Sequence, residues 1–111
     1  MPHIVCEYSA ELARYTNITI LLHDLHKTLA KESSVNLARI KTRGVPLNDF
    51  VIGDEAEYQH MIHITLKVME GRDPEVRKRI ALDLQTAARS HVKNCSVTVE
   101  VVELDKQTYC C

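Results

Sequence analysis

Apolar side chains recur along the chain at two different spacings, one typical of strands and one typical of helices. Residues 3–8 are predicted to form a strand. Farther along, apolar residues recur at spacings of three and four, which places them on one face of a helix: Ile18, Leu21, Leu22, Leu25 and Leu29. Thr16 or Asn17 can cap the start of that helix. A helix with a single apolar face needs a sheet to cover.

The second half of the chain repeats this plan. Residues 60–69 alternate as a strand does, with four aliphatic side chains on one face: Ile62, Ile64, Leu66 and Val68. Asp73 is a suitable N-cap and Pro74 a suitable first residue for the helix that follows. The buried face of that helix is predicted to hold Val76, Ile80, Leu84 and Ala87 or Ala88. The valine-rich residues 96–104 are expected to form the last strand.

The remaining strand is expected at residues 35–43, and its end is basic. Arg39, Lys41 and Arg43 alternate with uncharged residues. Successive side chains of a strand point to opposite faces, so the three cations are predicted to lie on one face.

Two β-α-β units joined side by side predict an α+β fold, in which a four-stranded sheet carries both helices on one face. The chain is expected to form one domain over residues 1–111, with repeats at about 2–45 and 58–104, a linker at about 46–57 and a tail at 105–111. The other face of the sheet is left uncovered. Val97, Val99 and Val101, or their alternating neighbours, are expected there, and an apolar face exposed to water favours self-association.

Composition and charge then exclude several classes of protein. Fourteen Lys and Arg against fifteen Asp and Glu leave a net charge of −1, which does not resemble the basic surface that binds nucleic acid. No segment approaches the ~20 apolar residues of a membrane span, and the first residues lack a secretory signal pattern. We therefore expect a soluble cytoplasmic protein. The four cysteines contain no C-x-x-C pair and are expected to be reduced thiols.

Pro2 follows the initiator methionine, and two interpretations of it differ in chemistry. A proline can simply start an edge strand, where its missing N–H is harmless. If Met1 is removed, however, the Pro2 nitrogen becomes a secondary amine with a basic lone pair. That amine is a candidate general base.

Three segments carry a resemblance to a known family: PHIVCEYS, ARIKTRGV and HITLKVMEGR. Together with the repeated β-α-β organisation, they resemble 5-carboxymethyl-2-hydroxymuconate isomerase, within the tautomerase superfamily, over roughly residues 2–104. The resemblance implies a homotrimer that works without a metal or an organic cofactor. It also implies a small acidic enol as substrate, from the degradation of aromatic compounds such as homoprotocatechuate. The implied reaction converts a dienol into a conjugated ketone.

The resemblance also implies roles for particular residues. Pro2 is expected to be the proton-transfer base, and Arg72 to bind substrate carboxylates and stabilise developing charge. Lys41 stands where the family has an arginine. A lysine keeps the positive charge but lacks the planar guanidinium that can bind a carboxylate through two hydrogen bonds. Arg39 or Arg43 is an alternative ligand for that carboxylate. The competing interpretation makes these cations a solvated strand end and Arg72 a surface residue beside Asp73.

Histidines contribute little to the predicted site. The resemblance places His63 in the third strand, where we expect it to support the site indirectly at most. His23 and His26 are three residues apart on a predicted helix, but two ligands in reach make a metal site unexpected. Two other functions stay open: a tautomerase of a smaller keto-enol acid, and a non-catalytic trimer that binds an acidic metabolite.

Overall fold

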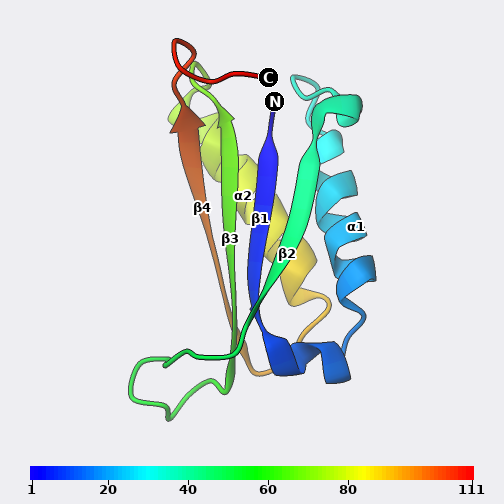
Figure 1. The fold of residues 1–111 in the computed structure, drawn as a ribbon, viewed down its shortest axis with the longest axis vertical. Coiled ribbons are helices and arrows are strands. Elements are labelled where there is room, and N and C mark those ends of the chain that lie inside the picture. Colours follow the sequence, from blue (N-terminus) through cyan, green and yellow to red (C-terminus); the bar gives the residue numbers. More distant parts are fainter.

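A four-stranded sheet carries both α-helices on one of its faces (Figure 1). The computed structural model describes residues 1–111. The strands are β1 (His3–Ser9), β2 (Lys41–Leu47), β3 (His60–Met69) and β4 (Cys95–Leu104). The helices are α1 (Ile18–Ala30) and α2 (Pro74–Arg89), with short 3-10 helices η1 (Ala10–Arg14) and η2 (Leu37–Arg39). Within the order β2-β1-β3-β4, the outer pairs are parallel and the central pair β1–β3 is antiparallel. The predicted α+β fold is confirmed.

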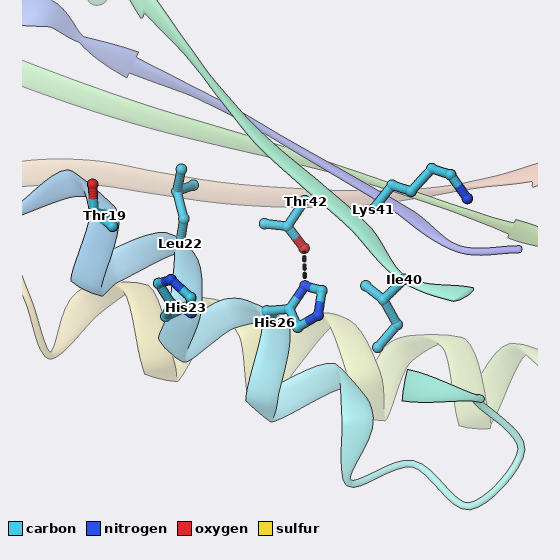
Figure 2. Close-up of a pocket in the computed structure, with 7 residues that line it drawn as sticks. All are labelled: Thr19, Leu22, His23, His26, Ile40, Lys41 and Thr42. Atoms are coloured by element: carbon cyan, nitrogen blue, oxygen red, sulfur yellow. Dashed lines mark hydrogen bonds between the residues drawn. The ribbon is translucent and has the colours of Figure 1, made fainter. Parts of the chain in front are cut away.

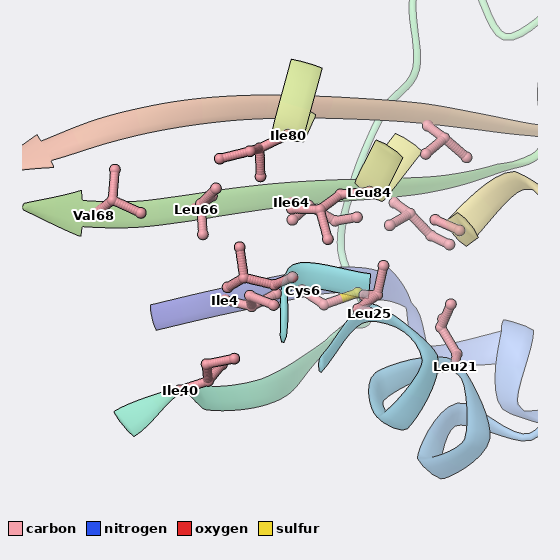
Figure 3. Packing of buried hydrophobic residues seen from close by; sticks show 14 of the residues in the cluster. Ile4, Cys6, Leu21, Leu25, Ile40, Ile64, Leu66, Val68, Ile80 and Leu84 are labelled. Carbon is pink, nitrogen blue, oxygen red and sulfur yellow. The ribbon is translucent and has the colours of Figure 1, made fainter. Parts of the chain in front are cut away.

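The core lies between the sheet and the two helices (Figure 3). Each predicted apolar stripe is buried: Leu21, Leu25 and Leu29 from α1, and Ile80, Leu84 and Ala88 from α2. The sheet contributes every second residue of its central strands: Ile4 and Cys6 from β1, and Ile62, Ile64, Leu66 and Val68 from β3. Asn17 caps α1, because its side-chain oxygen accepts a hydrogen bond from the Ile20 N–H at 3.1 Å.

The second strand lies farther along the chain than its pattern predicted. Residues 37–39 form η2 instead of a strand, and Asn36 starts this turn by accepting a hydrogen bond from the Ala38 N–H at 3.0 Å. The strand then runs over Lys41–Leu47. Arg39 consequently lies in the turn before β2, and the expectation that Arg39, Lys41 and Arg43 share one strand face was wrong for Arg39.

The uncovered face of the sheet is also more polar than expected. Val97 is buried under the helices, and Val99 and Val101 pack against the same core. Their alternating neighbours lie on the open face: Thr98, Glu100 and Val102. There Thr98 and Glu100 form hydrogen bonds with His63. Self-association through an apolar face is therefore the wrong physical argument for this sheet.

Residues 48–59 contain no helix or strand and extend away from one end of the sheet (Figure 1). At the other end, the chain's two termini lie close together (Figure 1). Neither α-helix has the length and apolar character needed to cross a membrane.

Candidate active site

Pro2 is buried at the end of the sheet where the two termini meet. It directly precedes β1, and its carbonyl oxygen accepts a hydrogen bond from the Lys41 N–H at 3.0 Å. The first residues are thus held against the start of β2. The position of Pro2 is defined by the backbone of both strands.

The amino group at the start of the chain lies among cations from three separate segments. Burial lowers the pKa of the Met1 amine, and the positive charges of Arg72, Arg39 and Lys41 lower it further, while Cys111 acts in the opposite direction. Arg39 belongs to η2, Lys41 begins β2, and Arg72 lies in the turn between β3 and α2. The fold therefore brings three of the predicted cations together around the residues next to Pro2.

Arg72 is held in place by backbone and hydroxyl oxygens. Its turn depends on Gly71, whose φ of +117° lies in the region that favours glycine. The guanidinium donates from Nη1 to the Met69 carbonyl at 3.4 Å, and from Nε and Nη2 to the Ser34 hydroxyl and carbonyl at 3.3 Å each. Arg72 forms no ion pair with Asp73 or with any other carboxylate of the chain. Its charge is therefore not neutralised by a neighbour.

Lys41 is exposed at one end of a shallow groove of about 490 Å³ between α1 and β2. Seven residues line this groove: Thr19, Leu22, His23, His26, Ile40, Lys41 and Thr42. Figure 2 shows the Lys41 side chain pointing away from His26, which instead forms a 2.7 Å hydrogen bond with the Thr42 hydroxyl. Lys41 is free to meet a ligand at this edge of the sheet, and the groove lining contains no carboxylate.

Two predicted residues lie outside this cluster of cations. Arg43 lies two residues beyond Lys41 and donates from Nη1 to Nδ1 of His3 at 3.1 Å. His63 lies opposite Glu7 in the β1–β3 pairing, whereas Lys67 lies opposite His3. Four residues of strand separate these positions, or roughly 13 Å. Within one chain, His63 therefore lies away from the residues around Pro2, and its supporting role stays a prediction.

Comparison with known proteins assigns the chain to one family. A family model for 5-carboxymethyl-2-hydroxymuconate isomerase matches residues 2–108. The chain belongs to this family. The resemblance found in the three sequence segments to this isomerase family is confirmed, and the protein is an isomerase. A search of curated proteins finds no match.

Solved structures agree with the isomerase family in fold. A 5-carboxymethyl-2-hydroxymuconate delta-isomerase superposes with a TM-score of 0.82 at 17% identity, over 100% of this chain and 87% of the other. A 5-carboxymethyl-2-hydroxymuconate isomerase from Deinococcus radiodurans R1 gives a TM-score of 0.82 at 22% identity, over 97% and 86%. A fused 4-OT wild-type symmetric trimer gives 0.74 at 15% identity, over 96% and 91%. At such identities these likenesses show the fold alone.

Sequence reasoning missed two residues of the isomerase near this end of the sheet, His3 and Tyr109. The Tyr109 hydroxyl lies 2.7 Å from Nε2 of His3, and their rings meet edge to face. Burial lowers the pKa of His3, and Arg43, Lys41 and Lys67 lower it further. The motif Met-Pro-His contained His3, but no pattern in the sequence links it to a tyrosine 106 positions away.

Proposed function

We propose that this isomerase shifts a double bond in an unsaturated 2-hydroxy di- or tricarboxylate, of the 5-carboxymethyl-2-hydroxymuconate type. The nitrogen of Pro2 serves as base and then as acid, once Met1 has been removed. One observation carries the proposal: Arg72, Arg39 and Lys41 lie close enough to the Met1 amine to lower its pKa, and Arg72 has no carboxylate partner of its own.

The proposed reaction requires an amine that is neutral at the working pH. A base that transfers protons works best when its pKa lies near that pH. Burial and neighbouring cations both disfavour the charged form of an amine. These influences lower the pKa of the Met1 amine. The Pro2 amine lies one residue farther along the chain, so we expect the same influences to act on it.

The proton balance of the reaction is simple. The neutral Pro2 amine accepts the hydroxyl proton of the dienol, which leaves a dienolate. The resulting ammonium then returns a proton to a carbon of the conjugated system, which gives the conjugated ketone and restores the neutral amine. Arg72 stabilises the negative charge that develops in between, because its guanidinium is already in place before the reaction.

The substrate carboxylates are assigned to the same cations. Arg72 can bind a carboxylate through two parallel hydrogen bonds, whereas Lys41 contributes a point charge. Arg39 is the third ligand, because it lies close enough to the Met1 amine to lower its pKa. Arg43 is a weaker candidate, since His3 already engages its guanidinium.

We further propose that the isomerase is a homotrimer. One protein of similar fold is described as a symmetric trimer. The polar open face of the sheet can be buried between subunits only if its charged groups find partners there. Sedimentation of the purified protein tests this assignment, with a mass of three chains expected and a monomer contradicting it.

A tautomerase of a smaller keto-enol acid is the second candidate, and Lys41 favours it. A lysine in place of the family's arginine weakens two-point recognition of a second carboxylate. Comparing kcat/KM for 5-carboxymethyl-2-hydroxymuconate and for phenylenolpyruvate separates the two candidates. The main proposal expects the substrate with more carboxylates to react faster.

Pro2→Ala tests the proposed base directly. A positioned base contributes about 10²–10⁴-fold to the rate, so we expect Pro2→Ala to lose about that much kcat. Intact mass spectrometry of both proteins establishes whether Met1 is absent. Because the terminal alanine keeps a primary amine, full activity in Pro2→Ala excludes a requirement for the secondary amine of proline.

A further inference from the structure

The C-terminal residues 105–111 fold back over the end of the sheet and return to the N-terminus (Figure 1). The Asp105 carbonyl accepts hydrogen bonds from the N–H groups of Thr108 at 3.2 Å and Tyr109 at 3.0 Å, which makes a compact turn after β4. The Lys106 N–H donates to the Glu70 carboxylate at 3.2 Å. The tail is thus fixed beside the turn that carries Arg72.

The contacts of His3 determine where its proton lies. A guanidinium has no acceptor atom, so Arg43 must donate to Nδ1 of His3, 3.1 Å away. Neutral His3 therefore carries its proton on Nε2. Burial and the neighbouring cations lower the pKa of His3, which favours this neutral form. The Nε2–H consequently donates to the Tyr109 oxygen at 2.7 Å.

This arrangement leaves the hydroxyl proton of Tyr109 without an acceptor in the chain. The Tyr109 hydroxyl has His3 as its one hydrogen-bond partner, and there it accepts. A phenol both donates and accepts, so its proton is available to an outside acceptor. Cys111, two residues farther on, lies close enough to the leading amine to affect its pKa. The free donor therefore belongs to the same end of the molecule as Pro2 and Arg72.

We propose that Tyr109 is a substrate-binding residue, whose hydroxyl donates a hydrogen bond to an oxygen of the acidic enol. His3 and Arg43 are positioning residues, because they fix the direction of that hydrogen bond. This inference rests on the function proposed for the Pro2 site. It adds a neutral donor, supplied by the tail, to the cations already assigned. An anionic oxygen is the preferred acceptor, since hydrogen bonds to charged groups are the stronger ones.

Tyr109→Phe removes the hydroxyl and keeps the ring against His3. A hydrogen bond to a charged group is worth about a ten- to hundredfold change in an equilibrium or rate constant, so we expect kcat/KM to fall by that factor. The affinity for glutarate, measured by calorimetry as a non-reacting dicarboxylate, is expected to fall with it. Tyr15→Phe is the matched control, because Tyr15 is 74% exposed and pairs with His60 instead. It is expected to leave both values unchanged.

Variants of His3 test the positioning role separately. A glutamine side chain can accept a hydrogen bond from Arg43 and donate one to Tyr109. The activity of His3→Gln is therefore expected to stay within about threefold of the wild-type activity. His3→Leu is expected to match Tyr109→Phe, and the double variant to lose no more than either single variant. Additive losses in the double variant contradict the proposed link between the two residues.

The outcomes separate this inference from the proposed function. If Pro2→Ala abolishes activity while Tyr109→Phe keeps both kcat/KM and glutarate affinity, the role of Tyr109 is refuted and Pro2 chemistry stands. If the wild-type protein turns over no enol but Tyr109→Phe still weakens glutarate binding, the binding role of Tyr109 stands and the isomerase chemistry proposed for Pro2 is refuted.

Discussion

Substitution of Arg72 separates the two roles assigned to it, binding of a carboxylate and lowering of the amine pKa. Arg72→Lys keeps the positive charge but loses the guanidinium's two-point hydrogen bonding, whereas Arg72→Gln loses both. The fold should tolerate either change. The three hydrogen bonds of the guanidinium are 3.3–3.4 Å long, at the weak end of the range, and together they contribute about 1 kcal/mol at most to stability.

The expected effect on activity is much larger. Loss of two-point carboxylate binding corresponds to about 1.5–3 kcal/mol, so kcat/KM of Arg72→Lys is expected to fall about 10–100-fold. Arg72→Gln also loses stabilisation of the dienolate, and a loss of about 10²–10³-fold is expected. Arg79→Gln is the matched control, since Arg79 pairs with Glu32 on the helical side and is expected to leave kcat/KM unchanged.

The pH dependence gives a second and more specific readout. Arg72 is the largest electrostatic cause that lowers the pKa of the Met1 amine, and we expect it to act in the same direction on the Pro2 amine once Met1 is removed. The neutral amine is the active form, so kcat/KM rises as the pH increases through that pKa. Removing the charge raises the pKa, and the acid limb of the profile should move to higher pH in Arg72→Gln but not in Arg72→Lys. An acid limb that stays in place in Arg72→Gln, with kcat/KM within twofold of the original, refutes the assignment.

Three further predictions concern binding, packing and acid stability. Lys41→Arg introduces a guanidinium that can bind a carboxylate through two hydrogen bonds, so it is expected to lower KM for a dicarboxylate enol several-fold with little change in kcat. An unchanged or higher KM argues against carboxylate binding at position 41. Leu25→Ala empties a fully buried position in the core, so the free energy of unfolding in urea should fall by about 2–5 kcal/mol. His3 has a pKa below its unfolded value of about 6.5, so its contribution to stability is complete above that pH and is lost as the pH falls through the folded pKa. His3→Gln should lessen this acid-induced loss, and an unchanged pH dependence of stability contradicts the reasoning.

The layers of the fold could be predicted from periodicity because the helix stripes are unambiguous. Leu21, Leu25 and Leu29 recur on one helix face, and all three are buried. The second strand could not be placed in the same way. Residues 35–43 alternate as a strand does, but a hydrogen bond that the Asn36 side chain accepts from the Ala38 N–H stabilises a 3-10 turn there. Local alternation did not reveal this competing contact.

The site was predictable only in part, for a similar reason. Pro2, Lys41 and Arg72 lie in short segments that resemble the family, and the structure places their surroundings at one end of the sheet. The link between His3 and Tyr109 joins opposite ends of the chain and depends on how the tail folds back. The resemblance also indicated His63, but within one chain His63 lies opposite Glu7, four strand positions from the residue opposite His3.

Titration of the Pro2 nitrogen by ¹⁵N NMR, in protein whose mass shows that Met1 is absent, is the decisive test of the proposed base. We expect a secondary amine that titrates at a lower pH in the wild-type protein than in Arg72→Gln, with a midpoint that matches the acid limb of kcat/KM. A fully active protein that retains Met1, and in which this nitrogen is an amide that does not titrate, contradicts the proposed role of Pro2.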